Sequence, residues 1–116
     1  MPSPETLIQV GLLGEAIDQG PVGVLVADEN MRYIAANQFA CVLLGYTRAQ
    51  LLDLRVTDVA PGPSSPEEYN EMIRKGYLAG TTELRRADGA AISARYVAGK
   101  TVVAGMELYV SVLLPD

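Results

Sequence analysis

Apolar and polar positions along the first twenty residues predict one helix. Ser3-Pro4-Glu5 has three features of a helix start: a capping hydroxyl, a proline at the first helical position and an acid in the first turn. The apolar residues that follow are Leu7, Ile8, Val10, Leu12, Leu13, Ala16 and Ile17. They cover a wider arc of the helical wheel than the ~100° stripe of a helix packed on a single core. This excess predicts a second partner for the helix, unless a loop or flanking segment covers the extra arc.

Two short strands are predicted after Gly20-Pro21, which ends the first helix. Residues 22–28, VGVLVAD, form a run of β-branched and aliphatic side chains typical of a buried strand. Residues 28–30 suit a turn, and MRYIAA, residues 31–36, then forms the return strand of a hairpin.

Helices that start and stop within a few residues are predicted next. Asn37 can cap the short helix QFACVLLG, and Gly45 then ends it. Thr47 and Gln50 have the S/T-x-x-E/Q spacing of a capping box, so another helix begins two residues after the previous one stops.

A longer helix is predicted to open at Ser65-Pro66 and to run to about Ala79. Its apolar face carries Tyr69, Met72, Ile73 and Tyr77. The opposite face of this helix is charged and is expected to face water.

After Gly80 the hydrophobic period changes from that of a helix to that of a strand. TTELRRA, residues 81–87, meets AISARYVA, residues 91–98, through Asp88-Gly89, a strong hairpin signal. A third strand follows, and one of its faces carries Met106, Leu108, Val110, Val112 and Leu114. The opposite side of the sheet is expected to hold Val97, Tyr109 and Leu113. That side is too apolar to face only water, so the N-terminal helix or a partner should cover it.

The order of the elements predicts the fold class. A helix, two strands, several short helices and three strands follow one another, whereas parallel doubly wound folds alternate strand and helix. The pattern favours an α+β fold with one antiparallel sheet and helices gathered on one side.

Composition limits the function classes. The 116 residues fit one domain, and 49% of them are hydrophobic, as in a globular protein. Nine basic and 14 acidic residues give a net charge of −5, and the basic residues do not cluster beyond Arg85-Arg86, so we expect no nucleic-acid binding. No apolar run reaches the ~20 residues of a membrane span, and the N-terminus has no signal-peptide pattern. We therefore expect a cytoplasmic protein without membrane contact.

The chain has no histidine and one cysteine. A conventional catalytic triad, a histidine-based metal site and a phosphate-accepting histidine are therefore excluded. Cys41 cannot form an internal disulfide, which fits a reducing compartment. It lies between apolar residues, where a free cysteine most often packs as a small hydrophobe.

From about Ala16 to Leu114 the chain resembles a PAS domain of the non-LOV type. The resemblance rests on the strand pair before Asn37, the break at Leu44-Gly45-Tyr46-Thr47, and the turn at Arg86-Ala87-Asp88-Gly89. It implies a five-stranded antiparallel sheet of order 2-1-5-4-3, with short helices over its inner face. Residues 1–19 would form a flanking dimerisation helix and residues 20–116 the PAS core.

The resemblance also implies a space between helices and sheet, which a metabolite can occupy or side chains can fill. Its candidate lining residues are Cys41, Leu44, Tyr69, Met72, Ile73, Tyr77, Leu84, Ile92, Tyr96 and Val110. No cofactor is expected. Haem-binding PAS domains usually ligate iron through a histidine, and the reactive cysteine segment of LOV domains would fall at Val56–Pro61, which has none.

The function implied is that of a regulatory sensor and dimerisation module without catalytic activity, serving two-component signalling or transcription regulation. An output domain is expected elsewhere in the parent protein. The homodimer interface would comprise Leu7, Ile8, Val10, Leu12, Leu13, Val97, Tyr109 and Leu113. The alternative is a small cone-fold enzyme of the isomerase type that uses a buried carboxylate and a tyrosine. Such an enzyme needs an inward carboxylate, whereas Glu83 and Glu107 are expected to face outward.

Overall fold

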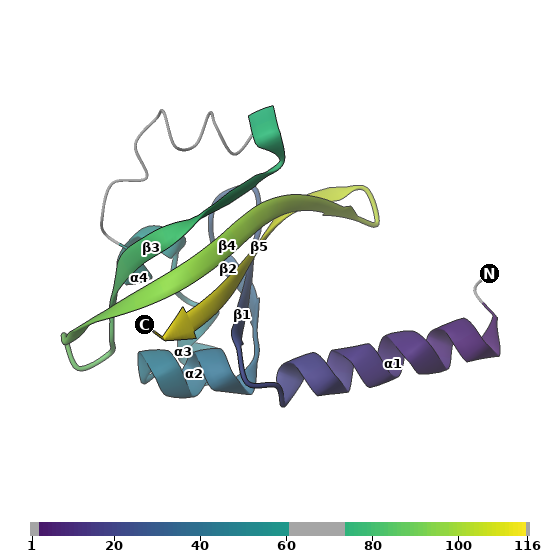
Figure 1. Ribbon diagram of the computed structural model, residues 1–116, viewed down its shortest axis with the longest axis horizontal. Helices are drawn as coiled ribbons and strands as arrows, with labels where there is room; N and C mark the ends of the chain where they lie inside the picture. Colours follow the sequence, from purple (N-terminus) through teal and green to yellow (C-terminus); the bar gives the residue numbers. More distant parts are fainter. Residues whose placement is uncertain (1–2, 61–73, 116) are drawn as a thin grey trace.

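Five antiparallel strands form one sheet, and short helices cover one of its faces (Figure 1). The computed structural model describes residues 3–60 and 74–115. The strands are β1 (Gly23–Ala27), β2 (Tyr33–Ala36), β3 (Tyr77–Arg85), β4 (Ala91–Val103) and β5 (Met106–Pro115). They lie in the order β2-β1-β5-β4-β3, and each pairing is antiparallel. The predicted fold class and strand order are confirmed.

The described helices are α1 (Pro4–Asp18), α2 (Gln38–Leu44), α3 (Arg48–Leu51) and α4 (Val56–Val59). Helix α2 packs closely on β1, because a Cβ atom added to Gly23 would lie 3.5 Å from the Ala40 Cβ. Small residues on both elements permit this approach. Each of the three short helices contributes one large, fully buried side chain to the core: Leu44, Leu51 and Val59. Burying a side chain of this size stabilises a fold by about 1.5–3 kcal/mol.

The register of the sheet decides which side chains face the helices. Leu113 of β5 pairs with Gly23 of β1 and with Tyr96 of β4, so these residues share the face that α2 covers. Tyr109 lies four residues from Leu113 on the same face and packs against the core. The predicted outward placement of Tyr109 and Leu113 is therefore wrong. Only Val97, which pairs with Val112, lies on the outer face as predicted.

Val110 also lies on the other face from the one predicted. It pairs with Val26 and Gly99, next to the pair formed by Val112 and Val97, and these are all outer positions. The prediction that Val110 floors the inner space is wrong. The reason is that both alternating sets of β5 contain large apolar residues, so alternation within the strand cannot decide its orientation; pairing with neighbouring strands does.

The predicted end of the helix at about Ala79 is wrong as well. Gly76 has φ of +83°, and pairing with β4 begins at Tyr77, opposite Gly99, so the helix does not reach Ala79. Tyr77 is consequently a strand residue, 56% exposed, and not part of a helical lid. Its spacing from the preceding apolar residues fits a helix, but ladder hydrogen bonds with the long strand β4 take precedence.

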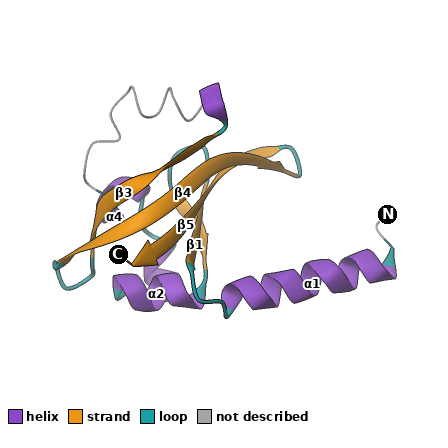
Figure 2. Ribbon diagram, in the orientation of Figure 1, coloured by secondary structure: helices purple, strands orange, loops and turns teal. Residues whose placement is uncertain are grey.

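Helix α1 stands apart from this packed unit. Ser3 caps it by accepting a hydrogen bond from the Thr6 N–H, as predicted, and it ends before Gly20. Figure 2 shows it extending away from the sheet and from α2. None of its fifteen residues is buried. The helix is formed as predicted, but its apolar side chains face solvent in the single chain.

Candidate functional site

Asn37 joins three elements at the base of the sheet. Its side-chain Oδ1 accepts hydrogen bonds from the backbone N–H groups of Ala40, at 3.1 Å, and Val24, at 2.8 Å. Its Nδ2 donates to the carbonyl oxygens of Ile17, at 2.7 Å, and Val22, at 2.8 Å. Asn37 is buried, and the amide makes all four of these bonds to backbone groups. The predicted cap is confirmed, and the same side chain also holds the connection from α1 to β1.

The break between α2 and α3 follows from two local devices. Gly45 adopts φ of +77° and donates its N–H to the Cys41 carbonyl, which ends α2. Thr47 and Gln50 form both bonds of a capping box, which starts α3. The interruption lets α2 lie against β1 while α3 lies against β2.

The turn of the β3–β4 hairpin contacts the C-terminal end of α2. Arg86 donates from Nη1 to the Leu43 carbonyl at 2.6 Å, and the Ala87 N–H donates to the Leu44 carbonyl at 2.9 Å. These bonds satisfy carbonyl groups that a helix end leaves without partners. The β3–β4 turn that resembles the PAS pattern therefore holds the C-terminal end of α2 in place by hydrogen bonds.

The residues predicted to line an inner space are only partly brought together. Cys41, Leu44 and Leu84 belong to one buried cluster, and Ile92 and Tyr96 pack against it. Tyr77 and Val110 lie elsewhere, as described above. Tyr69, Met72 and Ile73 lie outside the described residues. The described part of the predicted site is thus part of the packed core, to which α2, β3 and β4 each contribute side chains.

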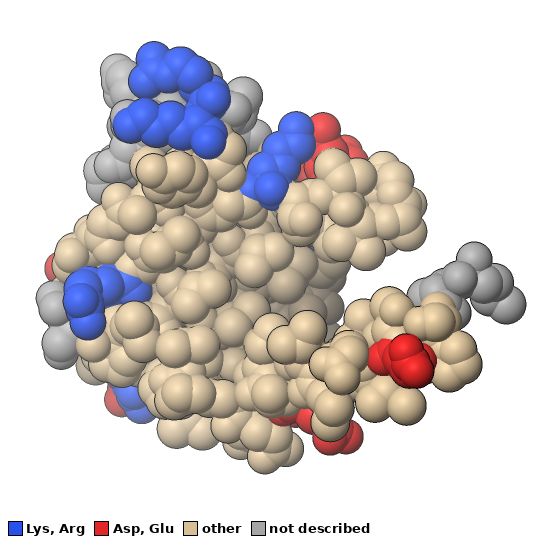
Figure 3. Space-filling model, turned by 45° about the vertical axis from the view of Figure 1, so that its right-hand side comes forward, with Lys and Arg blue, Asp and Glu red and all other residues tan. Residues whose placement is uncertain are grey.

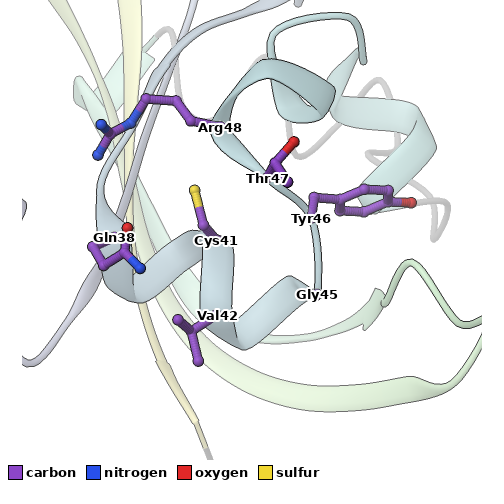
Figure 4. Close-up of a pocket in the computed structure, with 7 residues that line it drawn as sticks. All are labelled: Gln38, Cys41, Val42, Gly45, Tyr46, Thr47 and Arg48. Carbon is purple, nitrogen blue, oxygen red and sulfur yellow. The ribbon is translucent and has the colours of Figure 1, made fainter.

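A hollow of about 470 Å³ lies on α2 and the start of α3 (Figure 4). It is lined by Gln38, Cys41, Val42, Gly45, Tyr46, Thr47 and Arg48. In Figure 4 the Cys41 sulfur points toward the space between α2 and Arg48. Only Cys41 of this set was predicted as a lining residue. Two more of them, Gln38 and Val42, could have been found from their i, i+3, i+4 spacing with Cys41 on one side of α2.

The chemistry of this hollow does not favour a reactive thiol. Burial raises the pKa of the Cys41 thiol; Arg48 opposes this rise and Asp18 adds to it. A raised pKa keeps the sulfur protonated near neutral pH, and the protonated form is a poor nucleophile. The packing role predicted for Cys41 is consistent with this environment.

Carboxylates along the sheet show one further departure from the sequence prediction. Glu83 is exposed on the outer face, as predicted. Glu107 pairs with Val102 and lies on the same side of its strand as Tyr109, not on the outer face. It is half-buried and forms a 2.8 Å ion pair with Lys100 near the end of the β4–β5 ribbon. Among residues 3–60 and 74–115, no group of acidic, cysteine or histidine side chains is arranged to hold a metal ion.

Comparison with known proteins identifies the family. The model of the PAS domain family matches residues 21–112, most of the chain. The chain belongs to the PAS domain family. It is therefore a sensory regulatory module by family. No curated protein matches the chain.

Solved PAS domains share the fold of this chain. A PAS domain from a two-component sensor histidine kinase has a TM-score of 0.84 at 14% identity, covering 96% of this chain and 99% of its own. A PAS domain from Colwellia psychrerythraea has a TM-score of 0.81 at 16% identity, covering 93% and 97%. A domain of a sensory box sensor histidine kinase/response regulator from Geobacter sulfurreducens has a TM-score of 0.79 at 14% identity, covering 99% and 100%. At such identities the likeness shows a common fold. Within the described residues, no helix has the length and apolar character to cross a membrane.

Proposed function

We propose that this PAS domain is the sensor and homodimerisation module of a cytoplasmic signalling or transcription-regulatory protein, and that α1 supplies much of the dimer interface. The observation that carries the proposal is the exposure of α1. Leu7, Ile8, Val10, Leu12 and Leu13 are each 57–61% exposed. A solvent-exposed helix normally keeps its apolar residues on the side that packs against something.

The outer face of the sheet supplies a second apolar surface. We define the outer sheet patch as Val24, Val26, Val97, Val110, Val112 and Leu114, which alternate away from the core in β1, β4 and β5. Val97 and Leu114 are exposed, and the other four are half-buried. The patch replaces the predicted set that included Tyr109 and Leu113. Figure 3 shows that charged side chains are sparse over α1 and the surface next to it. Both surfaces fit an apolar contact with a second copy of the chain.

The proposed mechanism is a shift between two packings of α1. In one packing, α1 covers the outer sheet patch or the α1 of the second copy. In the other packing, α1 has moved away from that surface. A ligand or protein partner can shift this equilibrium only by its difference in affinity for the two packings. The core that would sense the ligand and the patch that α1 would cover lie on opposite faces of the same sheet, so a change on one face can reach the other.

Light scattering on point variants tests the dimer. Leu12→Glu places a charge in the apolar surface of α1, whereas Gln9→Glu adds the same charge to a polar position of the same helix. We expect the native chain and Gln9→Glu to have the mass of a dimer at tens of micromolar, and Leu12→Glu to have the mass of a monomer. A monomeric native chain, or a Leu12→Glu variant that stays dimeric, would contradict the proposal.

We further propose that the domain uses neither haem nor a covalent flavin. The sequence has no histidine, and its one cysteine lies in α2, not in the segment around α4 where the LOV cysteine would fall. The purified domain should show no absorption band above the aromatic ultraviolet region. Native mass spectrometry of the same sample distinguishes a retained metabolite from a core filled by side chains. A visible band that survives gel filtration would refute this part of the proposal.

A further inference from the structure

The last turn of α1 is where the described contacts between this helix and the core lie. The Ile17 carbonyl accepts a hydrogen bond from Asn37, and the Asp18 carboxylate accepts one from Arg48 Nη2 at 2.6 Å. The other turns of α1 contribute no buried residue. The direction in which this long helix leaves the core is therefore determined at its C-terminal end.

Arg48 is itself held at a fixed place by the core. Its Nε donates to the Ala36 carbonyl at 2.9 Å, at the end of β2, while Nη2 reaches Asp18. One guanidinium group thus joins the end of β2, the first turn of α3 and the last turn of α1. The planar, multiply donating guanidinium suits this bridging role, which a lysine could not reproduce.

We propose that the Asp18–Arg48 pair is a latch that sets the direction of α1 relative to the PAS core. Asn37 keeps the connecting chain in place, but a single hydrogen bond to Ile17 leaves the helix free to pivot; the second attachment at Asp18 removes that freedom. The inference deepens the proposed role of α1, and only its consequence for signalling rests on the dimer. The latch residues are 49% and 44% exposed, so the pair is accessible to solvent and to competing charged groups.

The latch also adjoins the hollow on α2. Arg48 is one of the lining residues, and Figure 4 shows its side chain on the side of Gln38 and Cys41. A group in the hollow that attracted the guanidinium would compete directly with Asp18. The geometry thus connects the surface of α2 to the direction of α1 through one side chain.

Residual dipolar couplings of backbone amides test the latch. In the native chain, the amides in the last two turns of α1 should share the alignment of the core. Asp18→Ala removes the acceptor but leaves the bond from Arg48 to Ala36, so the core should stay folded. Arg48→Gln removes both bonds. We expect a loss of coupling amplitude confined to α1 in either variant, and no additional loss when the two changes are combined.

Lys100→Gln is the matched control, because it breaks an ion pair of similar exposure and 2.8 Å length that joins β4 to β5 and does not involve α1. It should leave the couplings of α1 unchanged. All variants are also measured with Leu12→Glu, so that a partner helix cannot hold α1, and light scattering reports the dimer separately. Couplings of α1 that stay native in Asp18→Ala, or that are already averaged in the native chain, would overturn the latch whether or not the protein dimerises.

Discussion

Helices α1 and α2 are similar in composition and opposite in environment. Both are rich in aliphatic residues, yet α2 buries three of its seven residues and α1 buries none of its fifteen. Helix α2 is too short to be stable alone, and it is held by Asn37 at its start and by the β3–β4 turn at its end. Helix α1 is attached only through its last turn within the described residues. The comparison indicates that fixed ends, more than apolar content, decide which helix joins the core.

The largest expected effect comes from shortening an apolar side chain in each helix. Leu44→Ala in α2 should lower the free energy of unfolding by about 2–5 kcal/mol, because Leu44 is fully buried and a cavity would remain. Leu12→Ala in α1 should change it by no more than about 0.5 kcal/mol in a monomer, because Leu12 is 57% exposed. Urea denaturation at low protein concentration measures both. Equal losses would mean that α1 packs on the core after all.

Substitutions at Asn37 separate the stability that comes from capping α2 from that of the other hydrogen bonds made by this side chain. Asn37→Ala leaves four backbone groups without their partner, and we expect a loss of about 2–4 kcal/mol. Asn37→Ser can still cap α2 and should recover about 1 kcal/mol of that loss. The difference between the two variants in urea midpoint reports the cap alone. If serine recovers nothing, the cap contributes little and the links to β1 and α1 dominate.

The local features of this fold could be predicted from sequence because each depends on a few adjacent residues. Caps at Ser3, Asn37 and Thr47 and the stop at Gly45 have specific side-chain or backbone requirements. The strand order came with the PAS resemblance. The orientation of β5 could not be predicted, because it depends on pairing with strands far away in sequence. The same limit applies to the site, where the bridge from Arg48 to Asp18 spans 30 residues without any motif.

A smaller effect on the free energy of unfolding should distinguish the cap of α3, in the core, from the cap of α1. Thr47 and Ser3 each accept one backbone hydrogen bond of 3.1 Å at a helix start. Thr47→Ala should lower the free energy of unfolding by about 1 kcal/mol, because α3 is part of the cooperative core. Ser3→Ala should reduce helix content by circular dichroism without moving the urea midpoint of the monomer. A shift of the midpoint in Ser3→Ala would show that α1 unfolds together with the core.

The smallest expected effect is a change in how steeply the free energy of unfolding falls with pH in alkaline solution. It comes from Cys41 of α2, the helix that belongs to the core. The pKa of Cys41 is raised in the folded chain, chiefly by burial, whereas an unfolded thiol has a pKa of about 8.5. Below that pH both states keep the proton, and the thiol contributes no slope. As pH rises above it, the unfolded state loses its proton first, so stability falls until the folded thiol also ionises. The slope can reach at most about 1.4 kcal/mol per pH unit.

Tyr33, whose pKa burial also raises, adds a similar loss at higher pH. Cys41→Ala should remove the part of the loss that begins near pH 8.5 and keep the part due to Tyr33. Urea titrations across this range measure the difference between native and Cys41→Ala proteins, and parallel curves would show that the folded thiol titrates as an exposed one does.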